Sequence, residues 1–375
     1  MSTLKVDTIQ KADGTGSLSV PAESGTVVTT ASPSLGRRNL IINGAMQVAQ
    51  RGTSETGVTS SGFKQAPDRF QPLISGMGTW TVSQSTDSPD GFGSSYKLAC
   101  TTAQASPSAS DYFFLRYAFE GQNLQGLKKG TSNAESMTLS FWVKSNVTGT
   151  GNVSFWDYDN TRNYVETYTI SAADTWEYKT ITVSGDTTGA FDNNNGPSLL
   201  IDWFIDGGTD YTSGSAQASW AAKTNAVRGA SSTLALAGST SNYLYITGVQ
   251  LEVGSVATPF EHRSYGEELA LCQRYYYTCS NSGYMSGAGV NSTSLTAVRL
   301  PTPVPMRSSP SISDNSGTWL AQDVDSYTSG TGASFTLISF SANHLIVRVN
   351  NLTGLTDNRP GIVALYSGYS LDAEL

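Results

Sequence analysis

Short segments in which apolar and polar residues alternate constrain the fold of this chain more than any other feature of the sequence. They recur between residues 38 and 262, separated by turns rich in Gly, Asn and Ser. In MTLSFWVKS, Leu139, Phe141 and Val143 occupy every second position, and Trp142 falls among the polar residues. Side chains of a β-strand point alternately to opposite faces, so each segment predicts a strand with one buried face. The region as a whole predicts an antiparallel β-sandwich of the jelly-roll type.

Four further segments support this interpretation. Residues 178–185 and 243–253 alternate in the same way. NLIINGAM (39–46) predicts a strand that runs into a turn at its Asn-Gly pair. SLLIDWFID (198–206) is almost continuously apolar, and a strand of that composition is buried on both faces. The overall prediction is a mainly β fold.

The composition excludes several classes of protein. Only 14% of the 375 residues are charged, and the net charge is −8. Lys and Arg are scattered, whereas a protein that binds nucleic acid needs a basic stripe along its surface. No apolar run approaches the roughly 20 residues of a membrane-spanning helix. The start, MSTLKVDTIQ, lacks the apolar core of a signal peptide. We therefore expect no nucleic-acid partner, no membrane insertion and no signal peptide.

The cysteines and acidic loops bear on metals and cofactors. Cys100, Cys272 and Cys279 are too few for a disulfide framework and lack the neighbours of a zinc site, so buried free thiols are expected. The oxygen-rich loops 157–160 and 191–196 leave a structural calcium ion open, although such loops also form turns without one. We expect no cofactor and assign no metal ligand.

The two ends of the chain differ from its centre. Residues 1–37 contain three brief apolar alternations, which are Leu4/Val6, Leu18/Val20 and Val27/Val28. So few apolar residues do not build a core, and the segment either orders against copies of itself or a larger partner or is a disordered tail. Residues 279–375 return to β patterns, with strands expected at 334–341, 344–352 and 361–371. They predict a β-rich tip domain.

A helix is predicted between these parts, at residues 263–278. Ser264 and Glu267 have the spacing of a capping box, which begins a helix. Three residues follow at helical spacing and form an apolar stripe: Leu269, Cys272 and Tyr276. Copies of such a helix pack their stripes together around an axis, as in a short coiled coil. The segment therefore predicts a connector helix whose stripe packs against identical chains.

Candidate catalytic residues are sparse. The two histidines, His262 and His344, lack a triad or zinc motif, and Glu261 beside His262 would point to the opposite face of an extended strand, so we expect a structural or surface role for both. Asp157 and Asp159 are two residues apart, which on one face of a strand gives a spacing that glycoside hydrolysis uses, and Asp202 and Asp206 are also available. Asp is also common beside turns, and we expect no catalytic residue.

Aromatic residues beside acids predict a glycan-binding site. Six of the seven tryptophans fall between residues 80 and 220. Sugar CH groups stack on aromatic rings, while sugar hydroxyls need polar partners. Four residues have the required types and exposed positions: Trp142, Trp156, Asp157 and Tyr158. The alternative for each tryptophan is packing in the core or between subunits.

Several segments resemble tail-fibre and related structural proteins of tailed bacteriophages, many of them from cyanobacterial hosts (cyanophages). The segments that carry this resemblance are residues 39–52, APDRF (66–70), 138–146, 185–196, 245–276 and the terminal LDAEL. The leader LKVDTIQ…VPAESGTVVTT is similar to fibre N-termini. The resemblance implies a homotrimer with an attachment end at residues 1–37, a jelly-roll body similar to carbohydrate-binding modules, and a distal tip at residues 279–375. In such a trimer, the stripe of Leu269, Cys272 and Tyr276 is the predicted interface.

The function that the resemblance implies is that of a virion tail fibre made in the host cytoplasm. Residues 1–37 attach to other tail or baseplate proteins, and the β domains adhere to host polysaccharide or lipopolysaccharide without catalysis. Jelly-roll sugar binders often carry calcium-binding acids where this chain has Ala45 and Gln250, so no ligand is carried over. A tailspike-like glycan-depolymerising enzyme and a purely structural baseplate or neck component are the alternatives.

Overall fold

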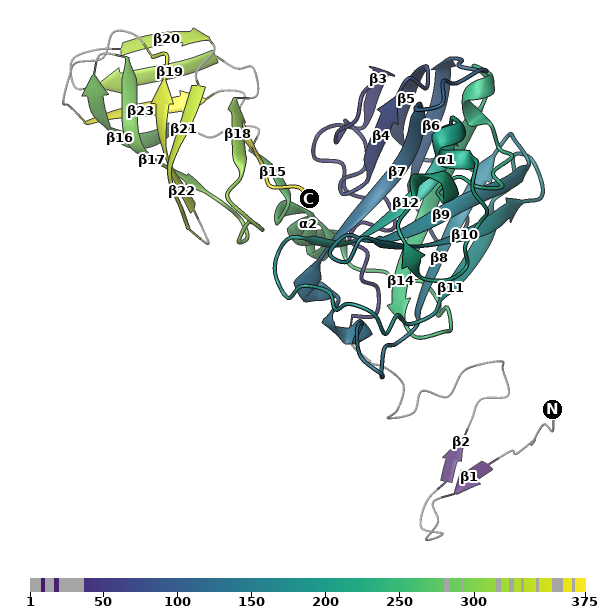
Figure 1. Cartoon of the computed structure of the whole chain (residues 1–375). Helices are drawn as coiled ribbons and strands as arrows, with labels where there is room; N and C mark the ends of the chain where they lie inside the picture. The colour runs from purple at the N-terminus through teal and green to yellow at the C-terminus, as the bar shows by residue number, and fades with distance from the viewer. Residues whose placement is uncertain are drawn as a thin grey trace. The chain divides into compact units, whose positions relative to one another are not determined.

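A computed structural model describes residues 8–10, 17–19, 37–279, 284–291, 293–314, 318–323, 327–331, 334–341, 344–352, 360–365 and 368–375. The chain divides into two units, Met1–Arg38 and Asn39–Leu375. In the first unit, β1 (Thr8–Gln10) pairs antiparallel with β2 (Ser17–Ser19) (Figure 1). Of the alternations expected there, Leu18 lies in β2, whereas the others lie outside the described residues.

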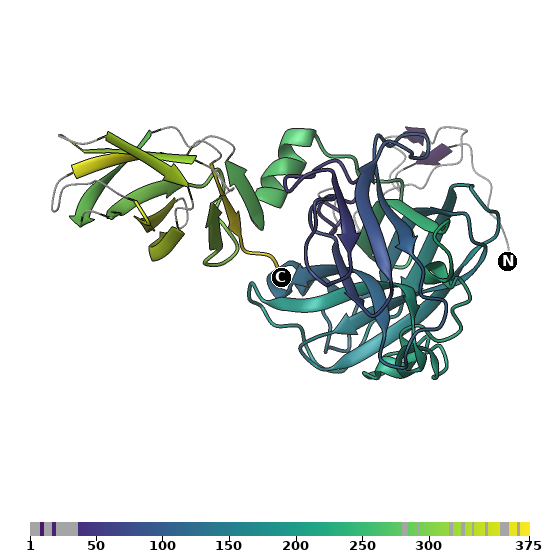
Figure 2. The same cartoon turned by 90° about the horizontal axis from the view of Figure 1, so that it is seen from above.

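Two six-stranded antiparallel sheets form the body of the second unit (Figures 1 and 2). The β12 sheet consists, in spatial order, of β13 (Ala221–Ala222), β10 (Arg162–Ile170), β9 (Gly149–Asp157), β12 (Pro197–Gly207), β7 (Tyr112–Glu120) and β4 (Gln71–Ser75). The β14 sheet consists of β11 (Glu177–Val183), β8 (Met137–Ser145), β14 (Tyr243–Val253), β6 (Ser95–Thr102), β5 (Thr79–Ser85) and β3 (Ser54–Val58). The chain crosses between the sheets at β6–β7, β7–β8 and β8–β9, which is jelly-roll connectivity.

The core lies between the two sheets and confirms the predicted alternation. Leu139, Phe141 and Val143 of β8 are all buried in it, and the Phe141 ring centroid is 5.8 Å from that of Trp203 in β12. Strand β12 is buried on both faces, as its apolar sequence predicts. The segment that follows β13 covers part of its outer face, where a Cβ on Gly229 would lie 2.5 Å from the Phe204 ring. Only Gly allows that approach.

Residues 39–46 do not form the predicted strand. The Asn39 side-chain Oδ1 accepts hydrogen bonds from the backbone N–H groups of Ile41 and Leu251, at 2.9 and 3.1 Å. Asn43 adopts the left-handed region, with φ of 62°. The pairing of β14 with β8 shifts register between Thr247 and Gln250. Hydrogen bonds from the Asn39 side chain and isolated backbone hydrogen bonds therefore pair the backbone groups of this part of β14, in place of the regular ladder of a neighbouring strand. The predicted strand at residues 39–46 is therefore wrong.

Helix α2 (Tyr265–Gln273) begins as predicted and ends earlier than predicted. The Ser264 hydroxyl accepts from the Glu267 backbone N–H at 3.3 Å, so the N-cap is confirmed. The prediction of a helix to residue 278 is wrong, because residues 276–279 form β15 (Tyr276–Cys279), which pairs with β24 (Tyr369–Asp372). Tyr and Thr favour strands, and a distant partner strand is available here. No helix among the described residues is long and apolar enough to cross a membrane.

The C-terminal region has two sheets and its own core. A seven-stranded sheet has the order β20 (Tyr327–Thr331), β19 (Thr318–Asp323), β23 (Pro360–Leu365), β16 (Tyr284–Asn291), β17 (Ser294–Pro301), β22 (His344–Asn350) and β21 (Ser334–Ser341). A three-stranded sheet joins β15, β24 and β18 (Ser311–Asp314). Leu345, Val347 and Val349 are buried, which confirms the alternation predicted for β22. The single strand predicted at 361–371 is instead divided between the two sheets, as β23 and β24.

Candidate functional site

The outer face of the β12 sheet gathers cations and aromatic rings. Strand register places Arg116 of β7, Ser154 of β9 and Asp202 of β12 side by side. Their neighbours Leu115, Phe155, Ile201 and Trp203 lie in the core, so these three side chains point outward. We call this surface the Trp156 face, and it consists of Arg116, Trp156, Tyr158, Asp202, Lys223 and Arg228.

Asp202 holds two arginines in fixed positions at this face. Arg116 donates from Nε and Nη2 to the two Asp202 carboxylate oxygens, at 2.7 and 2.9 Å. Arg228 donates from Nη2 to Asp202 Oδ2 at 2.6 Å. Burial of Asp202 opposes its ionisation, but the two guanidinium groups outweigh burial and hold its pKa below the ordinary value. The paired donors fix the plane of the Arg116 guanidinium as well as its position.

Trp156 lies among three cations and a second ring. The Lys223 Nζ is 4.2 Å from the Trp156 ring centroid, and the Arg116 and Arg228 Cζ atoms are 5.3 and 5.9 Å from it. The Tyr158 ring centroid is 5.3 Å from that of Trp156, and Tyr158 is 49% exposed. Lys223 is held there because its backbone N–H donates to Thr161 O in the β9–β10 turn. The result is an aromatic pair of half-buried Trp156 and exposed Tyr158, with cations beside the Trp156 ring.

Several buried polar atoms at this face have no hydrogen-bond partner among the residues that the structure describes. They are Asn152 Oδ1, Ser154 Oγ, Trp156 Nε1, Asn163 Oδ1 and Arg228 Nε. Leaving a buried donor or acceptor unpaired costs about 1 to 3 kcal/mol, and protein interiors rarely do so. A group of such atoms beneath a partly exposed ring is therefore typical of a place where water or a ligand supplies the missing partners.

The structure separates the four predicted glycan-binding residues. Trp156 and Tyr158 lie together at the Trp156 face. Asp157 points to the opposite side of β9, is fully buried, and contacts Lys129, with Asp157 Oδ2 2.6 Å from Nζ. Trp142 lies in β8, on the outer face of the other sheet. The four residues therefore do not form one site, because neighbours on a strand point to opposite faces.

Sequence reasoning did not select Arg116, Lys223 or Arg228. A signal for Arg116 was present, since FFLRYAFE and SLLIDWFID place Arg116 and Asp202 between apolar residues of their strands. A charge that is buried in this way requires a partner of opposite charge. Lys223 and Arg228 gave no such signal, because they lie in an irregular segment after β13.

The outer face of the β14 sheet is also aromatic, but its charges are balanced. We call it the Trp142 face, and it consists of Asp87, Lys97, Trp142, Lys144, Asp174, Trp176, Tyr178, Tyr243 and Tyr245. The Trp142 and Tyr178 ring centroids are 5.4 Å apart, and Tyr178 is 45% exposed. Lys144 is paired with Asp87, which also accepts from Trp176 Nε1 at 3.1 Å. Tyr243 donates to Asp174.

The carboxylates that were considered for catalysis each bind protein groups. Asp159 lies in the turn after β9 rather than on the strand and accepts from the Asp192 N–H at 2.9 Å. It therefore does not share a strand face with Asp157. Asp206 accepts from the N–H groups of Gly207 and Ala237, at 2.8 and 2.9 Å. The carboxylates that hydrolysis would need therefore accept hydrogen bonds from backbone N–H groups or take part in ion pairs.

The histidines and the loop at 191–196 also have local partners. The His262 ring packs against Phe92 and Phe260, with centroids 5.3 and 4.9 Å away. His344 Nδ1 lies 2.9 Å from Ser341 Oγ. In the 191–196 loop, the Asn194 side chain donates to Asp192 Oδ2 and accepts from the Gly196 N–H. These bonds are those of a self-supported turn.

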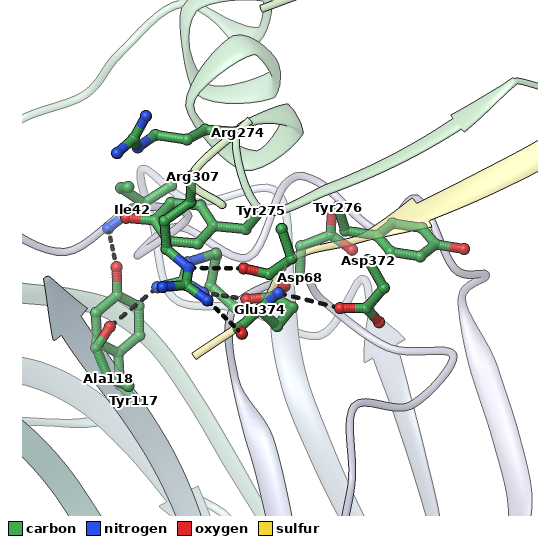
Figure 3. A network of polar contacts seen from close by, with 12 residues as sticks. Ile42, Asp68, Tyr117, Ala118, Arg274, Tyr275, Tyr276, Arg307, Asp372 and Glu374 are labelled. Atoms are coloured by element: carbon green, nitrogen blue, oxygen red, sulfur yellow. Dashed lines mark hydrogen bonds and ion pairs between the residues drawn. The ribbon is translucent and has the colours of Figure 1, made fainter. Parts of the chain in front are cut away.

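A polar network joins the sandwich to the C-terminal residues (Figure 3). Arg69, which is 1% exposed, pairs with Glu374 and donates to Ala118 O at 2.9 Å. Its Cζ lies 3.4 Å from the Tyr275 ring centroid. Arg307 donates to the backbone oxygens of Ala373 and Glu374, at 2.7 and 3.0 Å. The end of the chain is thereby held against the sandwich.

This network overturns part of the predicted trimer stripe. Cys272 is fully buried within its own chain, where its thiol lies in the field of Asp68, Glu268 and Arg69 and its pKa is raised by burial. Tyr276 lies in β15, and Arg51 Cζ is 3.6 Å from its ring centroid. Leu269 is partly exposed. The three side chains therefore do not form one exposed surface, because the helix ends before Tyr276. Cys100 is also a buried free thiol, as expected, and Cys279 is partly exposed.

Comparisons with known proteins give likenesses of fold. No protein-family model matches the sequence, and no curated protein matches it significantly. The enzymatically active domain of bacteriophage CBA120 tailspike protein 4 is similar at 13% identity and a TM-score of 0.29, over 57% of this chain and 21% of that one. The family 11 carbohydrate-binding module from Clostridium thermocellum, in complex with a β-1,3-1,4-mixed-linked tetrasaccharide, is similar at 9% identity and a TM-score of 0.28, over 55% of this chain and 99% of the module.

A protein of a different kind is similar to a comparable degree. A Stig cyclase from Fischerella sp. TAU, in complex with an indole compound, is 9% identical with a TM-score of 0.33, over 59% of this chain and 99% of the cyclase. Proteins that share a fold can have unrelated functions, so the site has to carry the functional argument. The chain spans only about a fifth of the tailspike structure, at 21%.

Proposed function

We propose that the protein is a non-catalytic adhesin that binds glycan at its Trp156 face. The observation that carries this proposal is the exposed ring of Tyr158 beside Trp156, with Lys223 4.2 Å from the Trp156 ring centroid. A sugar ring stacks its CH groups on such rings, and its hydroxyls bond to donors at their edge. Trp156 Nε1 and Ser154 Oγ, which have no hydrogen-bond partner among the described residues, are further polar groups at this face.

The wider role that we propose is that of a virion tail fibre. The sequence resemblance to phage fibre proteins supports it, with residues 1–37 as the attachment to other tail or baseplate proteins. The fibre is a homotrimer that adheres to host polysaccharide or lipopolysaccharide. The engagement of Asp157, Asp202 and Asp206 by protein groups supports binding over hydrolysis. Light scattering that found only a stable monomer would contradict the trimeric fibre.

The glycan site is tested with matched tryptophan variants on the two faces. The Trp156→Ala variant should weaken binding to the glycans that the wild-type chain retains on an array by about tenfold or more, because it removes a stacking surface. The Trp142→Ala variant removes an equal surface from the other sheet and should leave binding unchanged. Loss of binding in the Trp142 variant alone would move the site to the Trp142 face.

Two other results of this experiment contradict the proposal. If the wild-type chain binds no glycan, the adhesin role fails. If the bound glycan gains new reducing ends during incubation, the protein is a depolymerase.

A further inference from the structure

The charges on the Trp156 face are not balanced. Three cations, Arg116, Lys223 and Arg228, stand against one carboxylate, and Asp202 is the only described residue that forms an ion pair with any of them. Lys223 Nζ donates to Asn225 Oδ1 at 3.0 Å and pairs with no described acid. The chain as a whole has a net charge of −8, so this surface has the opposite sign to the protein.

Donor groups at this face lack acceptors. Arg116 uses Nε and Nη2 for Asp202, and no described residue accepts from its Nη1. Arg228 is 6% exposed, and its Nε has no hydrogen-bond partner in the described part of the chain. Buried N–H groups of a guanidinium are costly to leave unpaired, so an acceptor belongs here. An anionic acceptor is favoured over a neutral one because charge-assisted hydrogen bonds are about twice as strong.

The pKa of Lys223 agrees with an excess of positive charge at the Trp156 face. Its pKa is lowered from the ordinary value, first by burial and then by repulsion from Arg228 and Arg116, which Asp202 only partly offsets. A negative group bound beside Lys223 would relieve that repulsion. The Trp142 face offers no such excess, because Lys97 and Lys144 face Asp87 and Asp174.

We infer that the glycan bound at the Trp156 face is acidic. A carboxylate or phosphate substituent bonds to Lys223 and to Arg116 Nη1, while the sugar ring lies on Tyr158 and Trp156. The shared chemistry is a negatively charged oxygen group on a pyranose, for which the planar guanidinium has matching donors. This inference rests on the proposed glycan-binding function and names the class of glycan.

The experiment uses the full chain on an array that carries polyuronates such as alginate, dextran phosphate, and neutral dextran and mixed-linked glucan. The retained glycans should be acidic. Chemical reduction of the carboxylates to alcohols in a retained polyuronate should weaken binding about tenfold or more. Raising NaCl from about 50 mM to about 500 mM should also weaken binding, because salt screens exposed charges. Retention of dextran phosphate alone would identify phosphate as the anion.

Matched lysine variants locate the effect. Lys223→Gln keeps a donor for Asn225 but loses the charge, and it should weaken acidic glycan binding about fivefold to tenfold. Lys97→Gln removes an equal charge beside Tyr245, whose ring centroid is 5.1 Å from Lys97 Nζ, and should change nothing. Equal retention of neutral and acidic glycans, or no effect of Lys223→Gln, overturns the acidic preference and leaves the adhesin role standing. Retention of no glycan at all removes the proposed function and this inference together.

Discussion

The two outer faces of the sandwich are built from the same kinds of side chain but differ in how their charges are held. At the Trp156 face, a fully buried carboxylate, Asp202, fixes two arginines against the sheet. At the Trp142 face, the corresponding carboxylate, Asp87, is 42% exposed and holds one lysine. Burial makes an ion pair rigid and costly to break, whereas exposure makes it weak. The first face is therefore a fixed cationic surface and the second a neutral one.

The largest effect is expected from removing the carboxylate at the centre of the first face. Asp202→Asn leaves Arg116 and Arg228 buried without a counter-charge, so the free energy of unfolding should fall by about 3 to 5 kcal/mol. Asp87→Asn should lower it by no more than about 1 kcal/mol, because the Asp87 side chain is 42% exposed. Urea denaturation followed by tryptophan fluorescence measures both. Equal losses would remove the distinction between the faces.

Asp68 is a second buried carboxylate, close to the polar network that holds the C-terminal residues, and it sharpens the comparison with Asp202. At Asp202 the charges outweigh burial and lower the pKa, whereas at Asp68 burial outweighs the charges and raises it. Burial raises the pKa of Asp68 to about 6, and the bonds from Gln50 and the charge of Arg51 only partly oppose it, while Glu374 adds to it. The folded pKa is above the unfolded one, so the stability that this group contributes is complete below about pH 4 and is lost as the pH rises through about 6.

The prediction for Asp68 is a difference between two pH values. From pH 4 to pH 7, the wild-type chain should lose up to about 3 kcal/mol relative to the Asp68→Asn variant, which has no proton to release. The pH dependence of stability that Asp202 contributes has the opposite sign. Its pKa is lowered in the folded chain, so its contribution is lost only as the pH falls below the ordinary pKa range of a carboxylate. Urea denaturation of both chains at both pH values tests this. A constant difference between the chains would show that Asp68 titrates normally.

The smallest effect is expected from the two lysines at the edges of the faces. Neither Lys223 nor Lys97 forms an ion pair with a described residue, so each change to Gln should alter the free energy of unfolding by less than about 0.5 kcal/mol. Thermal denaturation of the two variants measures this. A larger loss of unfolding free energy in Lys223→Gln would show that this lysine stabilises the fold. The effect of the variant on glycan binding would then have to be measured under conditions in which the variant is fully folded.

Much of the sandwich could be predicted from the sequence because the signal is local. The alternation in β8 places Phe141 in the core and Trp142 outside, whatever strand lies beside it. The apolar run in β12 indicates burial on both faces, and Ser264 begins helix α2 through a bond three residues away. Each of these features depends on the pleat or the helical turn of one short segment.

The site could be predicted only in part. Trp156 and Tyr158 were found from residue type, but Asp157, which stands between them in the sequence, points to the opposite side of β9. Arg116 and Asp202 lie 86 residues apart, and Arg228 reaches Asp202 from a segment with no regular pattern. Strand order brings them together, and the alternation of each strand does not specify that order.

The sequence by itself determined which faces of the strands are buried, where the connector helix begins and that the chain is mainly β. Only the tertiary structure decided that Trp142 and Trp156 lie on opposite sheets, that Tyr276 joins a strand with residues 369–372, and that Arg69 pairs with Glu374, 305 residues away. The physical reason is the range of the interactions. Side-chain alternation and capping act within one turn or pleat, whereas ion pairs and strand pairing depend on which distant segments the core has already brought into contact.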